Sequence, residues 1–280
     1  MLASGFSSAI GNVFVAMLVL VGLAIYVTLI RQIAAKRSIP PPPTADTTAV
    51  TPPAPRTFGL PEAFLAGALM FFLILNITAA VEHSRVELNN RDLIANVLFT
   101  LFIVFFIAAF LKLRGIDIDA LGGFSRASLK RAISTGVVLL LSAAPLIAIA
   151  EVFTQSMLGG ESSKQEIVNL FNTSRTLDQR VTIIVLAVVI APICEEFIFR
   201  FFIYGVLRRY FGISIGLFVN ALLFAAAHTH LPSAAPLFVL GGCFTLAYEW
   251  SGSILVSMSM HALFNAANLV VLAFPQLVQQ

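Results

Sequence analysis

Charged residues are scarce in this chain. Asp, Glu, Lys and Arg make up only 11% of its 280 residues, whereas soluble domains carry about 25%. Hydrophobic residues reach 59%, and the mean hydropathy is +0.94. This composition excludes an ordinary soluble domain. Because the Lys and Arg residues stand mostly between apolar runs, it also argues against a nucleic-acid groove, and we expect no nucleic acid as a partner.

Several other features are missing. The chain has two cysteines, Cys194 and Cys243, and no CxxC, which argues against a disulfide framework or a cysteine-rich zinc site. No HExxH motif and no internal repeat occur. No Lys or Arg precedes the apolar run from Asn12 to Ile30, so the charged region of a signal peptide is lacking and the run is predicted to be a retained helix.

Long apolar runs are what the sequence has instead. A membrane-spanning helix needs roughly 20 mostly apolar residues. The sequence therefore predicts an all-α fold, a polytopic membrane helix bundle of about eight transmembrane helices. The predicted spans are Asn12 to Ile30, Glu62 to Val81, Leu93 to Leu111, Ile133 to Phe153, Val181 to Tyr210, Ile213 to His228, Ser233 to Glu249 and Ser253 to Phe274.

The connecting segments suggest how the chain is organised. Residues 38–57 are rich in Pro, Thr and Ala, a composition that favours extended chain. We expect an N-terminal transmembrane anchor (1–37), this Pro-rich linker (38–57) and a helical membrane domain (58–280). Two further segments, Lys112 to Arg131 and Thr154 to Arg180, exceed the length of a turn; each is either an interfacial helix or a solvated loop.

The distribution of positive charge predicts the orientation. With eight spans and an outside N-terminus, the outer loops hold five Lys and Arg residues and the cytoplasmic loops hold eleven, as the positive-inside rule requires. The eleven are Arg31, Lys36, Arg37, Arg56, Lys112, Arg114, Arg126, Lys130, Arg131, Arg208 and Arg209.

Two adjacent carboxylates and a guanidinium interrupt the fifth span. A charge at a helix centre costs about 2.5–3.5 kcal/mol, so these groups must satisfy one another or face a cavity. Glu196 and Arg200 are four residues apart and share a helical face, whereas Glu195 points about 100° away and is left free for proton transfer. Pro192 cannot donate to the carbonyl of Val188, which predicts a kink or hydrated gap just before the acids.

Polar residues also interrupt two later spans. His228 follows Phe224 by one turn on a face of alanines that permits close helix packing. His261 and Asn265 are four residues apart on one face of the last span. Each group alone fits an ordinary interhelical hydrogen bond as well as a function. Together, carboxylates, imidazoles and an amide on three helices are what water activation and oxyanion stabilisation require.

These residues resemble the motifs of a known family, the CPBP intramembrane glutamic endopeptidases, also called the CAAX protease or Abi family. Its motifs EExxxR, FxxxH and HxxxN appear here as EEFIFR (195–200), FAAAH (224–228) and HALFN (261–265), in the expected order. The resemblance implies a catalytic core at about 181–274.

The resemblance also implies roles for these residues. Glu195 and His228 would activate a water that attacks a peptide carbonyl, His261 and Asn265 would stabilise the oxyanion, and Glu196, held by Arg200, would orient the site. Neither a metal nor an organic cofactor would be needed. The expected partners are membrane lipids and a membrane-associated protein or peptide substrate, and the expected location is a prokaryotic plasma membrane.

Other functions are compatible with the same residues. Glu195, His228 and His261 are a possible zinc-ligand set, which would make the protein a metal-dependent membrane hydrolase. A transporter or a non-catalytic scaffold could also use intramembrane charges. The predicted spans contain one inconsistency: Glu195 and His228 lie at depths that differ by about 13 Å. Either the sixth helix is displaced along the membrane normal, or the fifth helix begins nearer Val188 and continues to Arg208; we favour the second, because Arg208 and Arg209 suit a cytoplasmic end.

Overall fold

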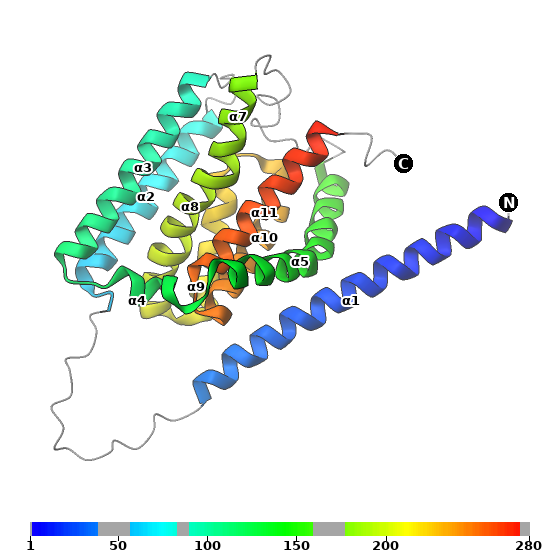
Figure 1. Cartoon of the computed structure of the whole chain (residues 1–280), viewed down its shortest axis with the longest axis horizontal. Helices are drawn as coiled ribbons and strands as arrows, with labels where there is room; N and C mark the ends of the chain where they lie inside the picture. Colours follow the sequence, from blue (N-terminus) through cyan, green and yellow to red (C-terminus); the bar gives the residue numbers. More distant parts are fainter. Residues whose placement is uncertain (1, 39–56, 83–89, 159–176, 275–280) are drawn as a thin grey trace.

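The computed structural model describes residues 2–38, 57–82, 90–158 and 177–274, and within them every regular element is a helix (Figure 1). The predicted all-α fold is confirmed. The long elements before the site are α1 (Leu2–Ser38), α2 (Leu60–Glu82), α3 (Asn90–Leu113) and α5 (Leu129–Leu158). A continuous helical path then comprises α7 (Leu177–Val185), the π-helical η2 (Leu186–Ile190), α8 (Ala191–Glu196), the π-helical η3 (Phe197–Tyr204) and α9 (Gly205–Ala227). The bundle ends with α10 (Ala234–Ser251) and α11 (Ile254–Ala273).

Seven segments of the described chain are long and apolar enough to cross a membrane. One of them, Leu177–Ala227, has 51 residues and contains the fifth predicted span and all but the last residue of the sixth. A straight helix of that length would reach roughly 76 Å, more than twice the apolar thickness of about 30 Å. The segment therefore has to turn back on itself.

Gly212 makes this turn. Its φ of 81° and ψ of 175° are non-helical values inside α9. After the turn, a Cβ built on Gly216 would lie 3.1 Å from the backbone nitrogen of Arg208, whereas residues eight apart in a straight helix are about 12 Å apart. The rings of Phe199 and Phe224 likewise lie 5.4 Å apart. The path is thus a helical hairpin, and its two arms are the predicted fifth and sixth spans.

The backbone conformation of Gly212 leads to a test of the hairpin. Its φ and ψ lie in a region that side chains other than Gly rarely occupy, at a cost of about 1–3 kcal/mol. We expect Gly212→Ala to lower the free energy of unfolding by that amount in detergent denaturation. Gly67→Ala is the matched control, because a Cβ there would meet nothing within 4 Å and Ala suits a helix better than Gly. Equal effects of the two substitutions would contradict the strained turn.

The hairpin also explains the difference in predicted depth between Glu195 and His228. The expected helix start near Val188 is wrong, because the helical path begins at Leu177, although it does continue through Arg208. Glu195 precedes Gly212 by 17 residues and His228 follows it by 16. Measured from their common turn, the two residues lie at the same depth. Depths measured from opposite faces of the membrane disagree because the first arm is longer than the apolar thickness.

Cations gather at the C-terminal end of α10. The Lys36 ammonium donates to the Trp250 carbonyl at 3.0 Å, and Arg126 donates to the Gly252 carbonyl at 3.4 Å. Arg208 pairs with Glu249 at 3.2 Å. These three cations come from loops predicted to share the cytoplasmic side, and here they meet at one end of the bundle. A helix C-terminus also favours positive charge, so they stabilise this end.

The first helix packs on α5 and α10. The buried Tyr26 donates to the Leu139 carbonyl at 3.0 Å, and the Trp250 indole donates to the Gln32 side chain at 2.6 Å. The predicted boundary at residue 37 and the linker nature of 38–57 stay predictions, and residues 39–56 lie outside the described part. Helix α1 therefore contacts α10, which also carries residues of the candidate active site.

The two long connecting segments have different outcomes. The segment from Lys112 to Arg131 folds into the short α4 (Ile118–Gly122) and a 3-10 turn, and the Tyr248 hydroxyl donates to the Leu121 carbonyl at 3.2 Å. It is thus packed against the end of α10. In the second segment α5 continues to Leu158, and residues 159–176 lie outside the described part.

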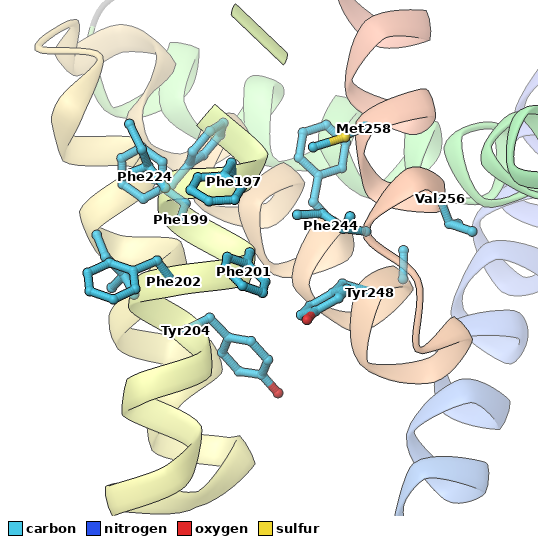
Figure 2. Close-up of a cluster of buried hydrophobic side chains, with 14 of the residues drawn as sticks. Phe197, Phe199, Phe201, Phe202, Tyr204, Phe224, Phe244, Tyr248, Val256 and Met258 are labelled. Carbon is cyan, nitrogen blue, oxygen red and sulfur yellow. The ribbon is translucent and has the colours of Figure 1, made fainter. Parts of the chain in front are cut away.

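Aromatic side chains fill the centre of the bundle. Figure 2 shows rings of η3, among them Phe199 and Tyr204, beside rings of α9 and α10. The outer surface is apolar as well: Phe64 on α2 and Phe105 on α3 are 77% and 72% exposed. Such a surface needs lipid rather than water around it. The chain is therefore an integral, multi-pass membrane protein.

Candidate active site

The two acidic residues lie in a distorted part of the hairpin. Glu195 and Glu196 end α8, which has Pro192 in its first turn and is flanked by the π-helical η2 and η3. A π-helix has wider turns than an α-helix, is rare, and often occurs at functional sites. The sequence predicted a local disturbance at Pro192, and the structure has one on both sides of the acids. The distortion changes which side chains of this arm face α9 and α11.

Glu196 is the centre of a fully buried cluster. Its Oε1 accepts from Arg200 Nη1 and from His261 Nδ1, both at 2.9 Å. Glu196 and Arg200 have no exposed surface, and the His261 side chain is only 4% exposed. The predicted pair between Glu196 and Arg200 is thus present. The bond to His261 was not predicted, and it joins α8 to α11.

Aromatic rings enclose Arg200. Its guanidinium carbon lies 4.2 Å from the centre of the Phe224 ring and 5.1 Å from that of Phe244. Arg200 Nη2 donates to the Gly241 carbonyl at 3.2 Å. A Cβ on Gly241 would approach Phe224 to 3.0 Å, so the absence of a side chain lets α10 come this close. The guanidinium is held by a carboxylate, a carbonyl and two ring faces.

Glu195 and two imidazoles converge in a more open region. Glu195 Oε2 lies 4.0 Å from His228 Nε2 and 3.9 Å from His261 Nε2. The side chains of Glu195 and His228 are 27% and 23% exposed. Within the described residues, Glu195 Oε2 has no hydrogen-bond partner. The site therefore combines a buried part, formed by Glu196, Arg200 and His261, with two partly exposed side chains, Glu195 and His228.

The hydrogen bonds of the two histidines fix their tautomers. His228 Nδ1 lies 2.8 Å from the Phe224 carbonyl, which can only accept, so this nitrogen carries hydrogen. His261 Nδ1 lies 2.9 Å from Glu196 Oε1, a carboxylate oxygen that also accepts from Arg200, so this nitrogen carries hydrogen as well. In the neutral rings, both Nε2 atoms then present lone pairs toward Glu195. Three proton acceptors, the Glu195 carboxylate and the two Nε2 atoms, thus converge, with each Nε2 atom 4.0 Å or less from Glu195 Oε2.

Asn265 lies one turn beyond His261 on α11. Its amide donates to the Ala187 carbonyl of η2 at 2.8 Å and so joins α11 to the hairpin arm that carries the two acids. The second amide hydrogen is left for another acceptor. A neutral His261 presents no hydrogen at Nε2, so it can donate to an oxyanion only when it is protonated. The roles of His261 and Asn265 in oxyanion stabilisation stay predictions.

The zinc alternative depends on the same atoms. Among the described residues, no group of three His, Cys, Asp or Glu side chains is close enough together to hold a metal ion. The adjacent Arg200 guanidinium also adds positive charge beneath the acids, which disfavours a second cation. A metal-content measurement decides between the two hypotheses.

Some residues of the site carry no motif signal. Phe244 stacks on the His261 ring with centroids 4.9 Å apart and 27° between the planes, yet nothing in the sequence separates it from other core aromatics. Gly241 is equally inconspicuous. Phe224 is marked in the sequence only as the first residue of FAAAH, although its ring also contacts Arg200. His230, two residues after His228, lies 2.9 Å from the Ser233 hydroxyl.

Comparison with known proteins gives a family match to the region that holds the site and a similar curated protein. Residues 177–267 match the family described as type II CAAX prenyl endopeptidase Rce1-like. The chain is also similar to the membrane-embedded CAAX protease MroQ of Staphylococcus aureus (strain USA300), with 34% identity over 83 residues. That alignment covers 28% of this chain and 34% of the relative, about a third of its length.

The matched region contains each residue that the motifs singled out, from Glu195 to Asn265. No solved structure matches the chain significantly. The resemblance stated from the motifs is therefore confirmed at the level of the family. Residues 177–267 thus match the Rce1-like type II CAAX prenyl endopeptidase family, in agreement with the resemblance to CAAX proteases.

Proposed function

We propose that this protein is an intramembrane endopeptidase that hydrolyses a membrane-associated protein or peptide through water activated by Glu195 and His228. The observation that carries the proposal is the convergence of Glu195 Oε2 with the Nε2 atoms of His228 and His261 at 4.0 and 3.9 Å. A water that donates at about 2.8 Å to two acceptors spans just such a separation. The family match of residues 177–267 and the relative's name as a CAAX protease support peptide hydrolysis.

The proposed reaction begins with the water. Glu195 takes one of its protons while His228 Nε2 accepts the other in a hydrogen bond, and the oxygen attacks the carbonyl carbon of the scissile peptide bond. The carbonyl oxygen becomes an oxyanion. The tetrahedral intermediate then loses its C–N bond, and the leaving amine takes the proton from Glu195. The products are a carboxylic acid and an amine, and Glu195 is again ionised.

The oxyanion needs hydrogen-bond donors. The second amide hydrogen of Asn265 is available, and His261 would provide an N–H at Nε2 when it is protonated. Glu196 lies 2.9 Å from the other side of the His261 ring and would stabilise that positive charge, as a carboxylate does for the catalytic histidine of serine proteases. The buried guanidinium of Arg200 holds Glu196 in place through their 2.9 Å pair.

The apolar surface and the positions of the positive charges indicate how the protein lies in its membrane. An apolar outer surface places the hairpin among lipids, and the acids lie about 17 residues from the cationic turn at Gly212. We propose a prokaryotic plasma membrane with this turn on the cytoplasmic side. The staphylococcal origin of the relative supports that location.

Hydrolysis is tested with purified protein in liposomes and a library of membrane-anchored peptides in H₂¹⁸O. We expect cleavage products that carry ¹⁸O in the new carboxylate, because water is the nucleophile. Activity should persist with 1,10-phenanthroline, and elemental analysis should find far less than one zinc per chain. Binding without cleavage would favour a scaffold, while chelator-sensitive cleavage with stoichiometric zinc would establish the metal-dependent alternative.

A further inference from the structure

A chain of hydrogen bonds extends from Arg200 away from the reacting groups. The Gly241 carbonyl, which accepts from Arg200 Nη2 at 3.2 Å, also accepts from the Thr245 hydroxyl at 2.9 Å. Thr245 Oγ1 in turn accepts from the Asn220 amide at 3.1 Å. Asn220 and Thr245 have no exposed surface. They belong to none of the three motifs, and among the described residues neither forms a hydrogen bond with Glu195.

The hydrogen-bond donors and acceptors of these residues are compatible with only one set of bond directions. The Thr245 hydroxyl has a single hydrogen, which goes to the Gly241 carbonyl, so its lone pair receives the Asn220 amide. Beyond Gly241, Arg200 donates to the carbonyl with one nitrogen and to Glu196 with the other. Glu196 then accepts from His261. Each hydrogen bond fixes the direction of the next, and such networks strengthen in a low dielectric.

Asn220 also lies on the face of α9 that forms the site. Asn220, Phe224 and His228 are spaced four residues apart, so they follow one another along one side of the helix. Phe224 contacts the Arg200 guanidinium at 4.2 Å, and its carbonyl fixes His228. One helical face thus supports the buried cluster at one end and presents an imidazole to Glu195 at the other.

A contribution to stability does not by itself explain why residue 220 is an Asn. Its Oδ1 is buried without a hydrogen-bond partner in the described part of the chain. A buried polar atom left unpaired costs about 1–3 kcal/mol, and Leu, which is of similar size, would avoid that cost. Such an unpaired group in a native structure calls for another explanation, and the contact with Thr245 provides one.

We infer that Asn220 and Thr245 are positioning residues, which hold Arg200 through the Gly241 carbonyl and thereby fix Glu196 and the orientation of His261. This inference rests on the proposed endopeptidase function. Thr245 acts by keeping the carbonyl in place, and Asn220 acts by orienting the Thr245 hydroxyl. The alternative is that they form an ordinary interhelical hydrogen bond between α9 and α10 with no effect on the site.

The test removes the Thr245 hydroxyl while keeping the shape of the side chain. We expect Thr245→Val to lower kcat about 10-fold with little change in KM, the low end of what orienting groups contribute in other sites. Thr245→Ser keeps the hydroxyl and should restore kcat. Asn220→Leu should act in the same direction, and the double variant should lose less than the product of the two because both interrupt one chain.

Thr154→Val is the matched control. Thr154 is buried on α5 and makes the same kind of bond to the carbonyl four residues earlier, at 2.9 Å. It lies outside the network around Arg200. Thr154→Val should leave kcat at the wild-type value, although it removes the same kind of intrahelical hydroxyl bond as Thr245→Val does.

A second measurement does not depend on cleavage. The protein has four histidines, so ¹⁵N-histidine NMR can resolve the Nδ1 signal of His261, assigned with His261→Gln. Thr245→Val should shift this signal and leave that of His228 unchanged. Wild-type kcat together with an unshifted His261 signal in Thr245→Val and Asn220→Leu would overturn the inference. If the wild type cleaves nothing, the proposed function fails, and the His261 signal alone decides the positioning.

Discussion

Replacing Glu195 with Gln is expected to lower kcat by about 10²–10⁴-fold, the range that general acid–base groups contribute. Gln has nearly the same shape but cannot take a proton from water. The Michaelis constant should change little, because the substrate carbonyl binds elsewhere in the site. The rate is to be measured on a membrane-anchored peptide that the wild type cleaves in liposomes.

The stability of this variant separates catalysis from folding. Glu195 Oε2 is buried with no hydrogen-bond partner among the described residues, so a neutral amide there should leave the free energy of unfolding unchanged or slightly raised. Functional groups commonly reduce stability in this way. Glu151→Gln on α5 is the control, because it makes the same substitution at a carboxylate that accepts from Gln155. A Glu195→Gln protein with wild-type kcat would remove Glu195 from the mechanism.

Much of the fold could be predicted because lipid imposes simple rules on sequence. Each predicted span corresponds to a helix or to an arm of the hairpin, and the boundary predicted between Tyr210 and Ile213 contains the turning residue Gly212. The ends of the spans were less predictable. Helices α1 and α5 run to Ser38 and Leu158, beyond the apolar runs that identified them, because polar residues continue a helix outside the membrane as well as apolar ones do.

The composition of the site could be predicted, but its hydrogen bonds could not. Spacing along one helix revealed the pair of Glu196 and Arg200, since residues four apart are neighbours. The bond from His261 to Glu196 joins residues 65 apart, and only the packing of α11 against α8 determines it. The π-helical turns and the ring of Phe244 over His261 depend on that same packing. No local pattern encodes them.

Removing the guanidinium of Arg200 should have the largest effect on stability. Arg200 and Glu196 are both fully buried and 2.9 Å apart. Arg200→Met leaves an uncompensated carboxylate in the bundle, and breaking a buried pair in this way costs about 3–5 kcal/mol. We expect that loss in the free energy of unfolding, measured in mixed detergent micelles, and a loss of cleavage with it. Arg208→Met is the control, because this guanidinium is 50% exposed and its pair with Glu249 should contribute at most about 1 kcal/mol.

The double variant Arg200→Met with Glu196→Gln distinguishes support of the fold from support of the chemistry. With both charges gone, no buried ion is left unpaired, so most of the lost stability should return. Cleavage should not return, because the neutral amide of Gln cannot stabilise a protonated His261 as Glu196 does. Recovery of both would mean that the ion pair serves folding alone. Recovery of stability without activity would show that Glu196 acts on His261, since the two effects then separate within one cycle of variants.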